Sequence, residues 1–253
     1  MILHATDPLI FIAAFLAGII NSIAGGGSFL TFPALVIAGV PAVAANATNT
    51  LALLPGTFAS TLSYRKQLAP IPGIPMPLLL TVSLIGGILG AVLLLKTPES
   101  AFQAIAPWLL LFATVVFTFG KQIGKFLKTH FHVGVAAYLI LQLIIAVYGG
   151  YFGAGVGILT LAVLSLYGMS NIHGMNAVKT LIAGALNTIA AAIFVFSGLI
   201  HWRECAVMAV GGIAGGYLGA WGAQRINPII IRATVIGVGV SMTIWFFIRY
   251  YSR

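Results

Sequence analysis

Long apolar segments separated by short polar stretches run along the whole chain. Residues 8–64 contain no charged side chain, and the segments 76–95, 180–200 and 205–223 also meet or approach the roughly 20 apolar residues that a helix needs to cross a bilayer. These segments are continuous and rich in Leu, Ile, Val and Ala, without the strict alternation of barrel strands. The pattern predicts an all-α polytopic membrane protein.

A pattern in the first half of the chain returns in the second half. Residues 24–31 align with 153–160 at a spacing of 129, and Gly39 falls on Gly168 at the same spacing. After one inserted residue, 46–51 align with 176–181, and 86–91 align with 215–220. The chain is therefore predicted to be two homologous repeats, 1–125 and 126–253.

Each predicted repeat has about four hydrophobic segments, and the first of them is broken at a Gly-rich stretch. Polar residues at 65–66, 96–99 and 121–132 are expected to form loops, and the last of these joins the repeats. The predicted segments are 9–38 (broken), 42–62, 76–95 and 104–120 in the N-terminal repeat, and 133–168 (broken), 173–199, 205–223 and 228–248 in the C-terminal repeat.

Two membrane topologies fit this pattern. If the broken segments cross completely, there are eight spans and the repeats are parallel; if each is a re-entrant hairpin, each half crosses three times and the repeats are inverted. Of the 12 Lys and Arg residues, all but Lys179 lie outside the apolar cores, and the parallel arrangement divides them eight to three, the inverted one seven to four. Because cytoplasmic loops are enriched in Lys and Arg, this count slightly favours parallel repeats.

The composition excludes several classes of protein. With 60% hydrophobic and 6% charged residues, the chain has too little polar surface for a soluble globule. Its formal charge of +9 comes from Lys and Arg between apolar segments, which reflects membrane topology and not a nucleic-acid partner. Cys205 is the sole cysteine, so neither an internal disulfide nor a thiolate metal cluster forms within the chain.

Lys179 is the one Lys or Arg in the middle of a predicted span, where a charge costs at least about 2.5 kcal/mol. Two interpretations are open: the side chain extends to the lipid headgroups, or it faces a water-filled cavity and pairs with an anionic substrate. The repeat favours the second. Asn176 and Lys179 align with Asn46 and Asn49, and a spacing of three residues places each pair on one helix face.

The Gly-rich stretches predict irregular backbone at membrane depth, which is tolerated where it is buried or lines a cavity. Helices that begin near Ser28 and Val156 would direct N–H groups and a partial positive charge at an anion. Close helix packing through small residues is the other interpretation. His173 is a candidate proton carrier or a structural side chain, and Asn21, Thr31, Asn187 and Thr188 are further candidates. The predicted substrate-binding residues are Lys179, Asn176, Asn46, Asn49, Gly25, Gly26, Gly27, Ser28, Ser22, Gly153, Gly155 and His173.

Sequence signatures of enzymes are missing. The chain has no HExxH, CxxC, GxSxG or P-loop motif and no carboxylate pair. We therefore expect no catalytic residues, no metal and no cofactor.

Several segments resemble the TauE/SafE family, the sulfite exporter or 4-toluene sulfonate uptake permeases. They are 17–28, 33–35, 39–42 and 45–49 in the first half, and 149–155 and 176–180 in the second. The resemblance spans nearly the whole chain. It implies a multi-pass carrier of the bacterial or archaeal inner membrane, with sulfite, sulfonates or related sulfur-containing organic anions as substrates.

Together these features predict a secondary transporter that moves a small anion by alternating access of the two repeats around a site near the bilayer midplane. An anion channel is an alternative, and a membrane-embedded enzyme or a structural subunit are further ones. The expected partners are a small anion and the lipid bilayer, with no nucleic acid; a homodimer is a further candidate assembly.

Overall fold

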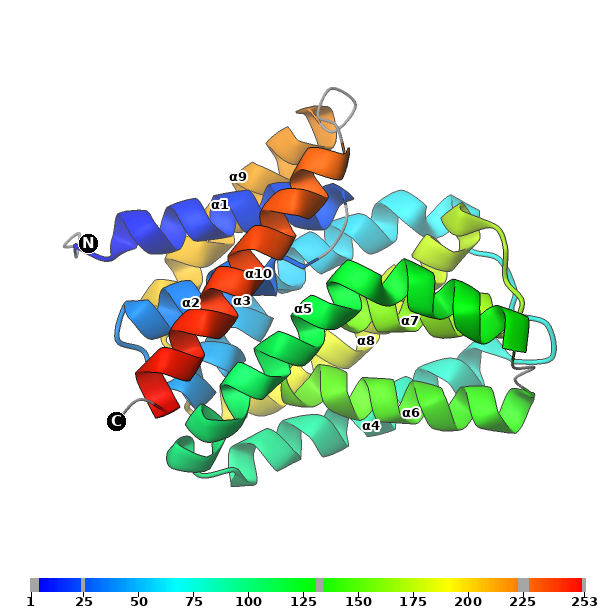
Figure 1. Ribbon diagram of the computed structural model, residues 1–253, viewed down its shortest axis with the longest axis horizontal. Coiled ribbons are helices and arrows are strands. Elements are labelled where there is room, and N and C mark those ends of the chain that lie inside the picture. The colour runs from blue at the N-terminus through cyan, green and yellow to red at the C-terminus, as the bar shows by residue number, and fades with distance from the viewer. Residues whose placement is uncertain (1–4, 24–25, 131–133, 223–227, 252–253) are drawn as a thin grey trace.

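The computed structural model describes residues 5–23, 26–130, 134–222 and 228–251, and these residues are almost entirely helical (Figure 1). A short 3-10 turn, Arg65–Gln67, follows the third α-helix. The α-helices are α1 (Asp7–Ile23), α2 (Ser28–Ile37), α3 (Ala42–Tyr64), α4 (Met76–Lys96), α5 (Glu99–His130), α6 (Val135–Tyr151), α7 (Val156–Leu166), α8 (Ile172–Phe196), α9 (Trp202–Gly222) and α10 (Pro228–Tyr251).

The short helices α2 and α7 fold back on the helices before them. Gly27, just before α2, lies against Ala17, so that an added Cβ would be 2.9 Å from the Ala17 Cβ. An added Cβ on Gly149 of α6 would likewise be 2.9 Å from Val156, the first residue of α7. Each pair is a helical hairpin, and in Figure 1 α1 and α2 point in opposite directions.

Two pairs of helices approach so closely that only small residues fit between them. On α4, an added Cβ at Gly86 would be 2.5 Å from the Cβ of Ala146, and Gly90 packs directly on the α6 backbone. On α9, Gly211 and Gly215 pack in the same way on the backbone of α1. Both contacts have glycines four residues apart, the spacing that lets membrane helices approach at their backbones.

Several helices carry large apolar side chains that are exposed on the surface of the described structure. On α4, Ile85, Leu89 and Leu93 are 48%, 52% and 51% exposed. Phe196 at the end of α8 is 91% exposed. Such extensive exposure of large apolar side chains is typical of a surface in contact with lipid and unusual for one in contact with water.

An aromatic cluster packs the part of the core near the chain termini. The Phe32 ring is the centre of this cluster, with ring centroids 6.3, 5.4 and 5.6 Å from Phe102, Phe152 and Phe246. These rings come from α2, α5, α10 and the segment after α6, so the cluster joins both halves of the chain. Figure 1 shows the two termini at the same end of the molecule.

Among the described residues, four helices are long and apolar enough to cross a bilayer, at 76–96, 99–120, 172–196 and 233–251. α3 has 23 residues but carries Asn, Thr and Ser side chains that lower its hydropathy. One predicted loop is wrong: residues 121–130 continue α5, because this stretch has no proline and half of it is Lys, Gln and Leu, which are good helix formers and outweigh the one glycine. The residues 131–132 at the end of that predicted loop lie outside the described residues.

Candidate functional site

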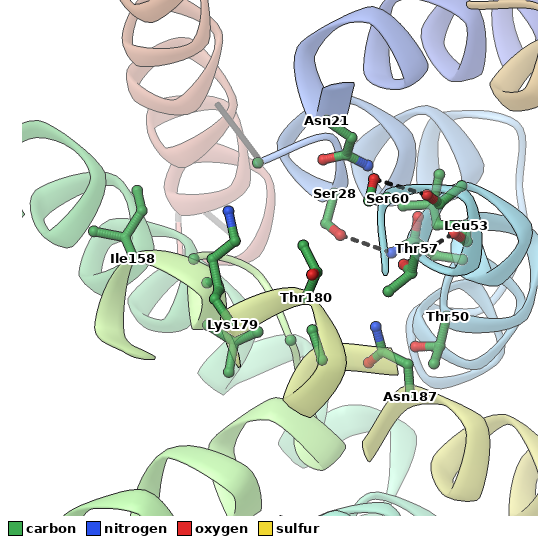
Figure 2. A pocket seen from close by; sticks show the side chains of 18 of the residues that line it. Asn21, Ser28, Thr50, Leu53, Thr57, Ser60, Ile158, Lys179, Thr180 and Asn187 are labelled. Atoms are coloured by element: carbon green, nitrogen blue, oxygen red, sulfur yellow. Dashed lines mark hydrogen bonds between the residues drawn. The ribbon is translucent and has the colours of Figure 1, made fainter. Parts of the chain in front are cut away.

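A polar cavity of about 140 Å³ lies between α3 and α8, beside the turns of both helical hairpins (Figure 2). The first half of the chain contributes Asn21, Gly26, Ser28, Asn49, Thr50, Leu53, Gly56, Thr57 and Ser60 to its wall, and the second half contributes Phe152, Gly153, Gly155, Val156, Gly157, Ile158, Lys179, Thr180, Ala183 and Asn187.

Lys179 extends from α8 into this cavity. Its Nζ donates a hydrogen bond of 3.0 Å to Oδ1 of Asn176, one turn earlier on the same helix. Its aliphatic stem lies on Gly157 in the first turn of α7, where an added Cβ would be 3.3 Å from the lysine Cδ. In Figure 2 the lysine ammonium faces Asn21 and Ser28 across the cavity.

No acidic side chain of the chain pairs with Lys179. All three acidic residues are described and have other partners. Asp7 forms an ion pair with Arg203, and Glu204 lies 3.7 Å from the same arginine. Glu99 accepts backbone hydrogen bonds from the first residues of α3, at 2.5 and 3.1 Å. The lysine charge in the cavity is therefore not balanced by any side chain of this protein.

Asn49 occupies the corresponding position in the first half and is held by two side chains of α2. Its Nδ2 donates to Oγ of Ser28 at 3.2 Å, and its Oδ1 accepts from the Thr31 hydroxyl at 2.5 Å. Asn49 is only 2% exposed. These bonds fix α3 to the start of α2 and leave a neutral polar wall on this side of the cavity.

Some N–H groups of the hairpin turns already have partners. The N–H of Gly27 donates to Oδ1 of Asn21 at 2.8 Å, and the N–H of Val156 donates to the carbonyl of Gly153 at 3.3 Å. Gly26 and Gly155 have φ of +103° and +77°, a backbone conformation that side-chain-bearing residues rarely adopt. The set of amides that remains for a ligand is therefore smaller than the glycine pattern alone predicts.

The structure brings six of the predicted site residues to the cavity wall: Lys179, Asn49, Gly26, Ser28, Gly153 and Gly155. Asn176 contacts the cavity through Lys179, while Gly27 is buried behind it. Asn46 faces away from the cavity and donates to the Tyr151 carbonyl at 2.8 Å. Gly25 and the side chain of Ser22 lie outside the described residues.

His173 does not line the cavity. It is exposed at the start of α8, where its backbone N–H bonds to the capping side chain of Asn171 at 3.0 Å. The helix places His173 almost two turns before Lys179, closer to the exposed helix end.

Sequence reasoning missed Thr50, Thr57, Ser60 and Thr180 as wall residues, whereas Asn21 and Asn187 were among its weaker candidates. A signal was present. Thr50, Thr57 and Ser60 recur on α3 at spacings of seven and three, which is the period of one helix face in an otherwise apolar segment. Hydroxyls on membrane helices also bond their own backbone, as Thr57 does to Leu53, so such a stripe is not specific to a cavity.

A comparison with known protein families identifies the family of this chain. The family model described as Sulfite exporter TauE/SafE matches residues 10–246. The chain belongs to the TauE/SafE family. This membership, together with the exposed apolar faces and the candidate spans, makes the protein a multi-pass membrane protein of a transporter family.

Similar proteins carry the same general description. The chain is 33% identical to the probable membrane transporter protein ORF9 of a Sinorhizobium species over 239 residues, 93% of this chain and 90% of that protein. It is 30% identical to a probable membrane transporter protein of Haemophilus influenzae, covering 93% and 92%. It is 28% identical to the probable membrane transporter protein YfcA of Escherichia coli, covering 90% and 86%. No solved structure matches this TauE/SafE protein.

Proposed function

We propose that this protein is a secondary transporter of the cytoplasmic membrane that binds a small anion, such as sulfite or a sulfonate, in the cavity between α3 and α8. Transport proceeds by alternating access of two repeats, α1–α5 and α6–α10, around this site. The volume of about 140 Å³ holds several waters or one small oxyanion.

The observation that carries the proposal is the ammonium of Lys179 in a polar cavity without an acidic partner. A charge at the centre of a membrane span costs at least about 2.5 kcal/mol and is retained where it serves a ligand or a pathway. An anion in the cavity would supply the opposite charge. The hydroxyl of Ser28, whose oxygen accepts from Asn49, and the amide of Asn187 would donate hydrogen bonds to its oxygens. The hydroxyls of Thr50 and Thr180 already donate to the backbone carbonyls of Asn46 and Ala177.

The repeat relation is supported by the composition of the cavity wall. The alignment of the two halves pairs six wall residues of one half with six of the other. A site built from equivalent positions is typical of transporters in which two repeats meet at the substrate. The pairs are Gly26 with Gly155, Ser28 with Gly157, Asn49 with Lys179, Thr50 with Thr180, Leu53 with Ala183, and Thr57 with Asn187.

Helix contacts support the same relation. When α1–α5 are exchanged with α6–α10, the contact of α1 with α9 becomes that of α6 with α4, and the contact of α3 with α9 becomes that of α8 with α4. The same exchange leaves the contact of α3 with α8 and the contact of α5 with α10 unchanged. A two-fold relation between the halves accounts for all of these pairs.

The direction of the helices favours inverted repeats over the parallel arrangement that the Lys and Arg count slightly favoured. α4 runs parallel to α6, since Gly86 meets Ala146 and Gly90 meets Gly150 four residues later. In Figure 1 α1 and α4 run in opposite directions, so α1 and α6 do as well. With α1–α2 and α6–α7 as hairpins, each half crosses the bilayer three times and the second half is inverted.

The test is anion flux into proteoliposomes that contain the Lys179→Met variant. Methionine keeps the length and apolar stem of the lysine and removes the charge, so we expect anion uptake to fall at least tenfold. Lys96→Met, at the exposed end of α4, is the matched control and should transport at the wild-type rate. Unchanged uptake by the Lys179 variant would remove the proposed role of this residue.

A channel with the same wall residues is the second candidate, because the cavity is lined by both halves in either case. Counterflow separates the two: a carrier loaded with unlabelled anion accumulates labelled anion transiently, whereas a pore only equilibrates it. Saturable counterflow with the wild-type protein is expected here.

A further inference from the structure

Two asparagines at equivalent positions of the repeats have different partners. Oδ1 of Asn176 accepts a hydrogen bond from the Lys179 ammonium at 3.0 Å. Its counterpart Asn46 is 1% exposed, and its Oδ1 has no hydrogen-bond partner among the described residues. The residue that corresponds to Lys179 is the shorter, neutral Asn49, which bonds to α2 instead.

The orientation of the Asn46 amide is fixed by its neighbour. Its nitrogen lies 2.8 Å from the carbonyl oxygen of Tyr151, and a carbonyl only accepts hydrogen bonds, so the atom facing it is the amide Nδ2. The other amide atom, Oδ1, is therefore an acceptor. A buried amide oxygen without a donor is costly unless something positive satisfies it.

The surroundings of Asn46 favour a cation. Tyr151 is the last residue of α6, and the carbonyl end of a helix carries a partial negative charge. The N–H of Gly153 donates to the Tyr148 carbonyl, which already accepts from Phe152, so the Gly149 carbonyl near the end of α6 lacks its usual helical donor. Helix ends and non-helical carbonyls of broken membrane helices are sites where transporters coordinate Na⁺.

We propose that Asn46 Oδ1 and the carbonyl end of α6 bind a monovalent cation of the size of Na⁺, in the place that the Lys179 ammonium takes in the other repeat. This rests on the repeat relation of the proposed function. In the second half, Asn176 then pairs with the covalently attached ammonium of Lys179. In the first half, Asn46 pairs with a cation that exchanges with the solution.

The position of this site connects it to the cavity. Phe152 and Gly153, which follow Tyr151 directly, are wall residues, and so is Asn49, one turn after Asn46 on α3. A cation beside Asn46 would thus lie immediately behind the wall and attract an anion in the cavity. Binding of the two ions is expected to be mutually favourable, and this reciprocity is the basis of coupled transport.

The experiment measures thermal stability of the purified protein without any anionic substrate. NaCl is titrated against N-methyl-D-glucamine chloride at constant ionic strength, with KCl as a parallel series. A ligand that binds only the folded protein raises its Tm in a saturable manner. We expect such a rise with Na⁺ in the wild type and a smaller one with K⁺. We expect the half-saturating concentration to fall at least tenfold in Asn46→Asp, which adds a carboxylate.

Asn46→Leu, which keeps the branching at Cγ but lacks the amide oxygen, should lose the Na⁺ response. Asn176→Leu is the matched control at the equivalent position and should keep it, because its oxygen serves Lys179. Equal Tm in Na⁺ and N-methyl-D-glucamine for the wild type, as expected if only water contacts Asn46, would overturn the proposal. So would an undiminished response in Asn46→Leu. Since chloride is constant in all series and no candidate substrate anion is added, these outcomes are independent of whether Lys179→Met abolishes flux.

Discussion

At the scale of single residues, Lys179 and Gly157 form a matched pair. In the first half the equivalent positions hold Asn49 and Ser28, which bond to each other at 3.2 Å. In the second half the longer lysine takes the space beside the first turn of α7, and glycine is the residue that leaves room for its stem. The two differences between the halves thus compensate each other sterically.

Adding one methyl group tests this pairing. In Gly157→Ala the Cβ would lie 3.3 Å from Cδ of Lys179, so the flexible lysine stem has to move by a few tenths of an ångström. A side chain forced off its preferred rotamer costs about 0.5–1.5 kcal/mol, so we expect KM for anion uptake to rise about 2- to 10-fold while the Tm is retained. Gly237→Ala on α10, where an added Cβ meets nothing within 4 Å, is the control. An unchanged KM would show that the position of the lysine does not depend on Gly157.

The candidate site could be predicted at the residue level only in part. Lys179 and Asn49 were identifiable because polar residues in an apolar repeat are conspicuous. The spacing of three residues predicts that Asn46 and Asn49 share a helix face. Side chains three residues apart on a helix still differ in direction by about 60°, which is enough for Asn49 to face the cavity while Asn46 faces α6. Which of two such neighbours faces a cavity depends on the partner helix, which the sequence does not specify.

At the scale of helices, two adjacent glycines of α9 are expected to respond in opposite ways to the same substitution. Gly215 packs on the backbone of Phe15, which cannot move aside, whereas an added Cβ at Gly216 meets nothing within 4 Å. Gly215→Ala should therefore lower the free energy of unfolding by about 1–3 kcal/mol. Gly216→Ala should leave it unchanged or raise it by up to about 1 kcal/mol through helix propensity. Tm values in one detergent compare them, and equal effects would contradict the packing of α1 on α9.

The helices were more predictable than their arrangement. The predicted segment 76–95 is α4 at 76–96 and 42–62 is α3 at 42–64, because apolar length and Pro residues define both ends. The pattern does not predict the extension of α5 to His130, because its last turns are polar, as a loop would be. The packing of α3 against α8 could not be derived in detail, because the polar residues indicate one face on each helix but not which residues of the two helices meet.

At the scale of the whole molecule, charge is distributed unevenly between the two ends. All three acidic residues, Asp7, Glu99 and Glu204, lie in the first turns of α1, α5 and α9, at the end of the molecule where α10 finishes, together with Lys96, Arg203 and Arg249. In the inverted arrangement the other Lys and Arg residues apart from Lys179 and Arg253, seven in number, are assigned to the opposite end, with the connections α3–α4, α5–α6 and α9–α10. Since cytoplasmic connections are enriched in Lys and Arg, that opposite end is expected to face the cytoplasm.

This orientation predicts the location of two reporters. Alkaline phosphatase fused after Arg253 should be active, because the C-terminus lies outside, and a fluorescent protein inserted between α5 and α6 should fold in the cytoplasm. Parallel repeats would place both positions on the same side of the membrane, since each half would then cross four times. Signals on opposite sides therefore require an odd number of crossings in the second half, which only a hairpin that returns to its own side provides. Signals on the same side would contradict the inverted arrangement and with it the equivalence of Asn46 and Asn176 across the bilayer midplane.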